Sequence, residues 1–270
     1  MEYVNTNRAQ VPALGLGTYR LRGRTCTETV SQGLEIGYRH IDTAEYYENQ
    51  TAIGQALADT AVSRDDLFIT TKVWRTNLDY EETKRVARES RQKLGLEAID
   101  LLLIHWPSRS VPIEETIEAM NELQAAGEVR HIGVSNFSVD QLANAREASE
   151  TPICTNQVEY NPYTDQADLL EYCIDHDIML TAYSPLAKGR VNDDDTLATI
   201  GDRYGKSPAQ VTLRWLIQQQ QVAAIPKASS HPHLQANLSI FDFELTDEEM
   251  TRIFDQQGGL IERVRSMLGL

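Results

Sequence analysis

The sequence predicts an α/β fold with a single (β/α)8 barrel over residues 1–270, and three observations support this prediction. Short apolar runs rich in strand-forming residues alternate with segments of helical periodicity along the whole chain. No linker rich in proline, glycine or serine divides them. The length of 270 residues is close to the ~250 residues typical of this barrel. The eight expected strands cover residues 13–17, 38–42, 67–72, 100–105, 130–134, 153–158, 178–183 and 222–226.

The segments between these runs have the features of amphipathic helices. Residues 80–95 (YEETKRVARESRQKLG) and 113–128 (IEETIEAMNELQAAGE) space their apolar residues three and four apart, begin with acids and end near glycine. A Rossmann domain is disfavoured, because residues 15–20 (GLGTYR) supply only two glycines and no helix follows them. Any nucleotide must therefore be held in another way.

The charge of the chain disfavours nucleic acid as a partner, and it does not decide between a halophilic and an ordinary acidic protein. A net charge of −15 opposes binding to phosphates, which require a basic surface. Most of the basic residues are arginines, and acids cluster in stretches such as 193–195. Such a composition suits a halophile with a high-salt cytosol, where ions screen the self-repulsion of an acidic surface, and equally suits an ordinary acidic protein.

Cysteine spacing and hydropathy predict a soluble cytoplasmic protein without a metal. No apolar run approaches the ~20 residues that span a bilayer, and the N-terminus lacks a signal pattern. Cys26, Cys154 and Cys173 lie far apart without metal-binding spacing, so we expect reduced thiols and no metal site. No stretch of the sequence indicates an oligomeric state.

Polar side chains close seven of the eight apolar runs. In a (β/α)8 barrel the C-terminal strand ends converge on one mouth, where active sites are built. A single histidine at such a position is ambiguous, but burying the whole set for packing alone would be costly. The closing residues are Asp42, Lys72, His105, Ser135 with Asn136, Gln157, Tyr183 and Lys227.

Three of these positions, together with Tyr47, suggest proton delivery to an oxygen atom. Tyr47 follows Asp42 by five residues, and a phenol becomes a useful acid when a cation such as Lys72 stabilises its phenolate. Asp42 would hold and charge-balance Lys72, and His105 could orient a carbonyl oxygen. Such a site contains no hydride, so we expect a nicotinamide cofactor.

The chain resembles the aldo-keto reductases along essentially its whole length. The ordered matches are GYRHIDTAEYYEN, TTKVW, LLLIHWP, GEVRHIGVSNF, NQVEYNPY, AYSPLAKG, YGKSPAQVTLRW, IPKASS and FDFELTDEEM. The resemblance implies that Asp42, Tyr47, Lys72 and His105 form the catalytic set, with Tyr47 as the general acid in reduction. Within the family it resembles the compact bacterial and archaeal type, which is similar to 2,5-diketogluconate reductases and methylglyoxal-reducing enzymes.

The resemblance also implies a set of cofactor contacts. Ser135, Asn136 and Gln157 would bind the nicotinamide carboxamide, and Tyr183 would stack on the ring. The pyrophosphate would be held by Ser184 and Leu186, the adenosine 2'-phosphate by Lys227, Ser229 and Ser230, and the adenine by Asn237. These contacts favour NADPH as the cofactor.

The sequence departs from the family pattern near the 2'-phosphate. Ala228, His233 and Ala236 replace the usual serine, arginine and glutamate, and a mostly neutral histidine does not restore the bidentate grip of an arginine. NADPH is still expected because Lys227 is kept, but NADH or dual use stays open. Gln50 replaces another usual glutamate, and we expect this change to affect only loop anchoring.

The expected substrate is a small carbonyl compound held by aromatic walls, namely Tyr19, Tyr46, Trp74, Trp106 and Phe137. Two other functions remain open at this point. One is a nicotinamide-binding, redox-sensing regulatory subunit with little turnover, which the complete catalytic set disfavours. The other is a phosphate-handling barrel isomerase or lyase in which Lys227 grips the substrate, and cofactor-free activity would indicate it.

Overall fold

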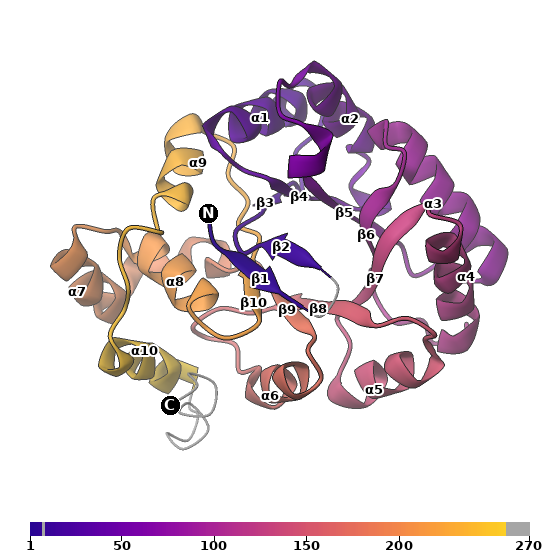
Figure 1. Cartoon of the computed structure of the whole chain (residues 1–270). Coiled ribbons are helices and arrows are strands. Elements are labelled where there is room, and N and C mark those ends of the chain that lie inside the picture. The colour runs from indigo at the N-terminus through magenta and orange to yellow at the C-terminus, as the bar shows by residue number, and fades with distance from the viewer. Residues whose placement is uncertain (7–8, 258–270) are drawn as a thin grey trace.

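The computed structural model describes residues 1–6 and 9–257, and its main feature is an eight-stranded parallel sheet that curls into a barrel (Figure 1). Strands that are neighbours in the sheet are also neighbours in the sequence. The barrel strands are β3 (Leu16–Gly17), β4 (His40–Asp42), β5 (Phe68–Val73), β6 (Ile99–Ile104), β7 (Val129–Ser135), β8 (Ile153–Glu159), β9 (Met179–Tyr183) and β10 (Val222–Ala224).

The first and last strands of the sheet meet and close the barrel. Leu14 forms a parallel bridge with Ala224, and the amide nitrogen of Gly17 donates to the carbonyl oxygen of Pro226 at 3.0 Å. A Cβ atom at position 17 would lie 2.6 Å from the carbonyl oxygen of Ile225. Glycine at position 17 therefore allows the two strands to approach this closely.

The helices lie around the outside of the barrel (Figure 1). They are α1 (Gly23–Ile36), α2 (Gln50–Asp59), α3 (Tyr80–Leu94), α4 (Ile113–Ala125), α5 (Val139–Ala148), α6 (Ala167–Asp175), α7 (Asp195–Tyr204), α8 (Pro208–Ile217), α9 (His231–Leu238) and α10 (Asp247–Phe254). Short 3-10 turns are η1 (Glu45–Tyr47), η2 (Arg64–Asp66), η3 (Ala187–Asp193) and η4 (Asp255–Gln257).

The helix boundaries follow from local sequence signals. The Asp79 side chain accepts a hydrogen bond from the backbone nitrogen of Glu82 and starts α3, and Gly95, with φ of 68°, ends it. Ser207 starts α8 with a capping box and is followed by proline at the first helical position. The predicted helices 80–95 and 113–128 thus correspond to α3 and α4.

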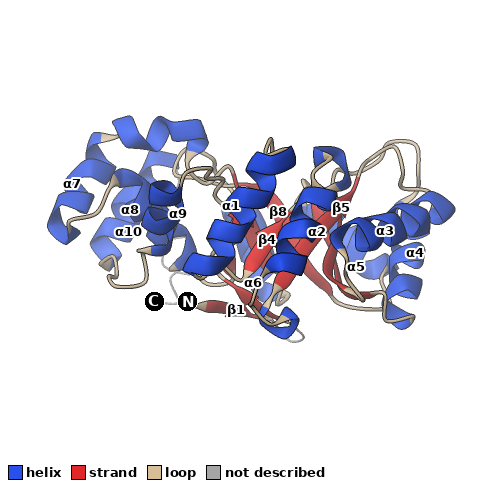
Figure 2. Cartoon of the chain, turned by 90° about the horizontal axis from the view of Figure 1, so that it is seen from above, coloured by secondary structure: helices blue, strands red, loops and turns tan. Residues whose placement is uncertain are grey.

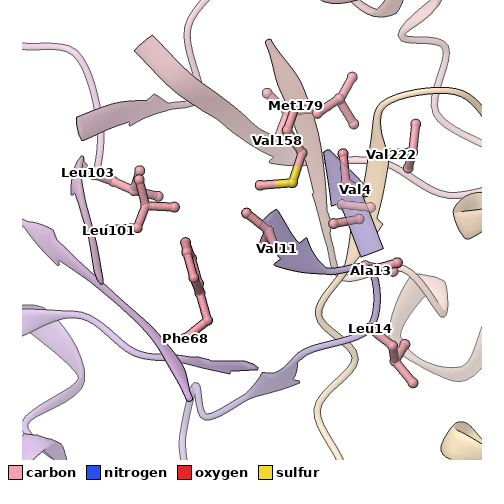
Figure 3. Packing of buried hydrophobic residues seen from close by; sticks show 14 of the residues in the cluster. Val4, Val11, Ala13, Leu14, Phe68, Leu101, Leu103, Val158, Met179 and Val222 are labelled. Atoms are coloured by element: carbon pink, nitrogen blue, oxygen red, sulfur yellow. The ribbon is translucent and has the colours of Figure 1, made fainter. Parts of the chain in front are cut away.

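An antiparallel hairpin of β1 (Tyr3–Asn5) and β2 (Gln10–Pro12) lies across one end of the barrel (Figures 1 and 2). Val11 is fully buried and points into the barrel interior beside Phe68 and Met179 (Figure 3). These two residues begin β5 and β9, so the hairpin covers the N-terminal ends of the strands. This hairpin was not predicted from the sequence.

The predicted fold class is confirmed, and each of the eight predicted runs overlaps a barrel strand. The first strand is shorter than predicted, because only Leu16 and Gly17 of the run 13–17 pair with β4. Residues 7–8 and 258–270 of the predicted single domain lie outside the described part of the chain. No helix within the described ranges is both long enough and apolar enough to cross a membrane.

Candidate active site

A cavity of about 350 Å³ opens where the barrel strands end. The predicted site residues that line it are Tyr19, Asp42, Tyr46, Tyr47, Trp74, His105, Trp106, Ser135, Asn136, Gln157, Tyr183, Ser184 and Lys227. Gly17, Thr18, Glu159, Lys188 and Ile225 also line it. These five residues were not predicted, because the residue that closes each strand was the main signal for the site, although Glu159 and Lys188 lie inside the motifs NQVEYNPY and AYSPLAKG.

The turn that carries Tyr47 is fixed by a buried asparagine. Asn49 Nδ2 donates to the carbonyl oxygens of Thr18 and Leu21 at 2.9 and 3.1 Å. The Thr43 hydroxyl donates to Asn49 Oδ1 at 2.6 Å. One side chain therefore ties η1 to both the loop after β3 and the end of β4, and a buried polar group satisfied in this way holds its surroundings rigidly.

Two further contacts anchor the same turn. The backbone nitrogen of Trp74 donates to a carboxylate oxygen of Glu45 at 2.9 Å. Gln50, at the start of α2, is buried and its amide donates to the hydroxyls of Thr71 and Ser90 at 2.8 and 2.9 Å. Gln50 thus serves as an anchor for α2.

Lys72 lies behind Tyr47 in a buried ion pair with Asp42. Its Nζ donates to Asp42 Oδ1 at 2.6 Å and to the carbonyl oxygen of Thr43 at 2.8 Å, and the Tyr47 hydroxyl is 3.5 Å away. The second Asp42 oxygen accepts from Gln157 Nε2 at 2.8 Å. Both ionic side chains are at most 2% exposed. Burial lowers the pKa of Lys72, and the adjacent carboxylate partly offsets this effect.

Burial opposes ionisation of the Tyr47 phenol, although Lys72 Nζ lies beside its hydroxyl. Burial, followed by the negative charge of Asp42, raises the pKa of Tyr47 well above its ordinary value. Tyr47 therefore keeps its proton at neutral pH, as a proton donor must.

His105 is uncharged at neutral pH. Burial, aided by the positive charge of Lys72, lowers the pKa of His105 to about 3. Its Nδ1 is buried without a hydrogen-bond partner among the residues that the structure describes. The Tyr47 ring lies 5.6 Å from the imidazole, centroid to centroid. A neutral imidazole at this place can hydrogen-bond an oxygen atom but is a poor source of a proton.

Asn136 links three strand ends across the cavity floor. Its Nδ2 donates to the carbonyl oxygen of His105 and to the Ser135 hydroxyl, both at 3.0 Å, and its Oδ1 accepts from the Tyr183 hydroxyl at 2.9 Å. The Ser135 hydroxyl donates to the carbonyl oxygen of Gln157 at 2.7 Å. A carboxamide bound here would have to share or replace some of these hydrogen bonds.

Two of the predicted phosphate contacts, Ser184 and Lys227, line the cavity, and Lys227 gives it a cationic side. Lys227, after β10, and Lys188, in η3, are exposed and line it together. Ser184 and Lys188 have φ of 47° and 57°, so the loop between them turns through left-handed backbone. Leu186, Ser229, Ser230 and Asn237 are not in the lining, and Asn237 is buried at the inner face of α9.

The lining side chains fit a nicotinamide dinucleotide. Lys188 and Lys227 suit its phosphates, the polar groups of Ser135, Asn136 and Gln157 suit a carboxamide, and the half-buried Tyr183 ring offers an aromatic face. The described residues contain no group of three side chains able to hold a metal ion.

Four of the five predicted aromatic walls reach the cavity. Tyr46 stacks on Trp74 with ring centroids 4.1 Å apart, and Tyr19 and Trp106 are among the exposed large side chains. Phe137 does not reach the cavity, because it is 3% exposed and packed in the hydrophobic core. Its prediction as a substrate contact is therefore corrected.

The fold and this cavity together define a barrel oxidoreductase that acts on carbonyl groups. Comparison with known proteins identifies it further, since residues 13–256 match the model of the Aldo/keto reductase family. The chain belongs to the aldo/keto reductase family.

Similar proteins agree with this assignment over almost their full lengths. The chain is 40% identical over 251 residues to the 9,11-endoperoxide prostaglandin H2 reductase of Trypanosoma cruzi, covering 92% of this chain and 88% of the relative. It is 39% identical over 248 residues to the glyoxal reductase of Bacillus subtilis, covering 92% and 89%. A solved structure assigned as a 2,5-diketo-D-gluconic acid reductase B superposes with a TM-score of 0.93 at 43% identity, covering 97% and 94%.

A further solved neighbour, an aldo-keto reductase complexed with NADPH, has a TM-score of 0.89 at 32% identity and covers 96% of this chain and 88% of its own. The family and its reductase-named relatives establish nicotinamide-dependent carbonyl reduction. The regulatory-subunit and the isomerase or lyase interpretations have no support among these comparisons.

Proposed function

We propose that this reductase converts small aldehydes and α-dicarbonyl compounds to alcohols in the cytoplasm, with NADPH as the preferred cofactor. The observation that carries the proposal is the buried Lys72–Asp42 pair beside Tyr47 and a neutral His105 in one cavity. The bound nicotinamide would supply the hydride. The side chains must then position the carbonyl group and deliver one proton to its oxygen.

Tyr47 is the proton donor in this proposal. Its hydroxyl stays protonated before the reaction because burial and Asp42 raise its pKa. Once the proton has moved to the substrate oxygen, the phenolate that remains is 3.5 Å from the Lys72 ammonium, which stabilises it in a low-dielectric surrounding. Asp42 keeps Lys72 charged and in place, since a buried lysine alone would tend to lose its proton.

His105 orients the substrate oxygen by a hydrogen bond. With a pKa of about 3, its imidazole is neutral throughout the physiological range and cannot compete with Tyr47 as the acid. Trp74 packs edge-on against it with ring centroids 5.0 Å apart and limits its movement. A fixed neutral donor at this position favours a single orientation of the carbonyl group.

The size of the cavity supports a small substrate. Its volume of about 350 Å³ lies at the lower end of the usual range for ligand pockets, and the cofactor would occupy part of it. The names of the glyoxal reductase and the 2,5-diketo-D-gluconic acid reductase B point to dicarbonyl compounds of this size. The aromatic walls Tyr19, Tyr46, Trp74 and Trp106 would hold the remainder of the substrate.

The preference for NADPH is assigned to Lys227. We expect Lys227→Gln to weaken NADPH binding about ten-fold and NADH binding less than two-fold, because only NADPH carries the 2'-phosphate and a charged hydrogen bond contributes ~1.5–3 kcal/mol before solvent screening. Titration of tryptophan fluorescence with each cofactor measures both dissociation constants. Lys93→Gln, at an exposed site on α3, is the matched control and should change neither value. Equal weakening of both cofactors would instead assign Lys227 to the pyrophosphate.

A further inference from the structure

Glu159 is a carboxylate of the reaction cavity that takes no part in proton delivery. It ends β8 and lines the cavity together with Gln157 and Tyr183. Side chains alternate along a strand, so Glu159 lies on the same face of β8 as Gln157 and closer to the end of the strand. In the parallel sheet Glu159 is paired with Tyr183 on β9, which places these two side chains next to each other.

The carboxylate of Glu159 is not engaged by other side chains. Its backbone is held, because Gln166 Nε2 donates to the Glu159 carbonyl oxygen at 3.0 Å. The half-buried carboxylate itself has no ion-pair or hydrogen-bond partner among the residues that the structure describes. Its charge reaches the neighbouring phenol, since burial, followed by the negative charge of Glu159, raises the pKa of Tyr183 to about 12. The negative charge therefore acts inside the cavity.

The other charges of the cavity have partners or suit the phosphates of the cofactor. The second carboxylate in the lining, Asp42, lies 2.6 Å from Lys72 Nζ and also accepts from Gln157. Lys188 and Lys227 are the cations of the lining, and a phosphate is the natural partner of such ammonium groups. A dinucleotide held by the two lysines would leave the charge of Glu159 uncompensated until the reaction creates a positive charge.

Reduction of a carbonyl group changes the charge of the nicotinamide ring. Hydride transfer moves one hydrogen nucleus and two electrons from the ring to the carbonyl carbon, and Tyr47 gives a proton to the carbonyl oxygen. The ring is neutral before this step and carries one positive charge after it. A charge that is already in place where the opposite charge develops stabilises the transition state, because no group has to reorganise during the reaction. Lys72 acts in this way on the phenolate of Tyr47, and a carboxylate would do the same for the ring.

We propose that Glu159 stabilises the positive charge that the nicotinamide ring gains during hydride transfer, and that it thereby strengthens binding of the oxidised cofactor but not of the reduced one. This inference rests on the proposed function and adds a charged residue on the cofactor side of the same site. Its place in the sheet supports it, since the neighbours Gln157 and Tyr183 are the residues expected to contact the carboxamide and the ring. A carboxylate beside them acts through a half-buried space, where salt screens charges less than at the open surface.

Glu159→Gln tests the inference, because it removes the charge and keeps the size of the side chain. Titration of tryptophan fluorescence with NADP⁺ and with NADPH gives both dissociation constants without turnover. We expect the NADP⁺ constant to rise about five-fold, which corresponds to one partly exposed charge pair of ~1 kcal/mol, and the NADPH constant to stay within about two-fold. The value of kcat for aldehyde reduction should fall by a smaller factor, since only part of the charge has developed in the transition state.

Two further variants separate the charge from the rest of the side chain. Glu159→Asp keeps the carboxylate and should retain most of the wild-type ratio of the two dissociation constants. Glu171→Gln, at an exposed position on α6 outside the cavity lining, removes the same charge from the protein and should change neither constant. An unchanged NADPH constant in Glu159→Gln also shows that the cofactor site of the variant is folded.

Three outcomes would overturn the inference. Equal weakening of both cofactors in Glu159→Gln would assign the carboxylate to the ribose hydroxyls, which the two forms share. Tighter binding of both would show that Glu159 repels the phosphates, and unchanged constants would show that its charge does not reach the ring. Because the constants are measured without turnover, an inactive wild type would count against the proposed function, whereas the expected shift in the ratio would still support the role of Glu159.

Discussion

Tyr47→Phe is expected to lower kcat for aldehyde reduction at least ~10²-fold to 10⁴-fold, the range supplied by general acid catalysis, while the NADPH dissociation constant stays within about two-fold. The substitution removes the hydroxyl 3.5 Å from Lys72 Nζ and leaves the ring that packs against Tyr19 and His105. Steady-state NADPH oxidation and fluorescence titration measure the two quantities. A loss of kcat without a change in the NADPH dissociation constant would show that Tyr47 delivers the proton and contributes little to cofactor binding.

The alternative proton donor is His105, and if it were the acid, Tyr47→Phe would keep much of its turnover. If Tyr47→Phe kept a substantial fraction of wild-type turnover, the acid role would pass to the imidazole, in conflict with a His105 pKa of about 3. Tyr46→Phe is a matched control, since Tyr46 is the adjacent tyrosine of the same turn and is 51% exposed. We expect it to affect KM more than kcat.

Lys72→Met is expected to abolish reduction and also to destabilise the fold by about 3–5 kcal/mol, the usual effect of removing one partner of a buried ion pair. The Asp42 carboxylate would remain buried with its Gln157 hydrogen bond and without a neutralising cation. Urea unfolding measures the loss of stability, and NADPH oxidation measures the loss of activity.

The double variant Asp42→Asn/Lys72→Met separates these two effects. It removes both charges, so we expect it to recover most of the lost stability but none of the activity, because the phenolate of Tyr47 would still lack its cation. If Lys72→Met alone had the same free energy of unfolding as the wild type, Lys72 and Asp42 would not form a buried ion pair. Recovery of activity in the double variant would show that the lysine charge is not needed for proton transfer.

The barrel could be predicted because its signals are local and repeated. Each strand is a short buried run whose bounds are given by its own apolar residues, as in LLLIHWP around β6. The polar strand ends could be predicted for the same reason, since the C-terminal ends of parallel strands meet wherever the fold is a barrel. Asp42, Lys72, His105 and Asn136 therefore could be grouped before any coordinates were known.

The remaining features depend on contacts that sequence patterns do not encode. The β1–β2 hairpin has only three residues in each strand, and its burial comes from the barrel interior that it covers. Phe137 follows a strand end as Trp106 does, but its ring packs into the core. The raised pKa of Tyr47 depends on how deeply the fold buries the phenol and on its distance from Asp42, which the local sequence does not give.

The most direct measurement of the central claim is parallel oxidation of NADPH and NADH by the wild-type protein with 4-nitrobenzaldehyde, at low and at molar KCl, with the alcohol product quantified. We expect multiple turnovers, one molecule of alcohol for each NADPH oxidised, and faster turnover with NADPH than with NADH. Activation by KCl would further indicate a protein adapted to a high-salt cytosol. A folded protein that binds NADPH but forms no alcohol under any of these conditions would contradict the claim that this cavity reduces carbonyl groups.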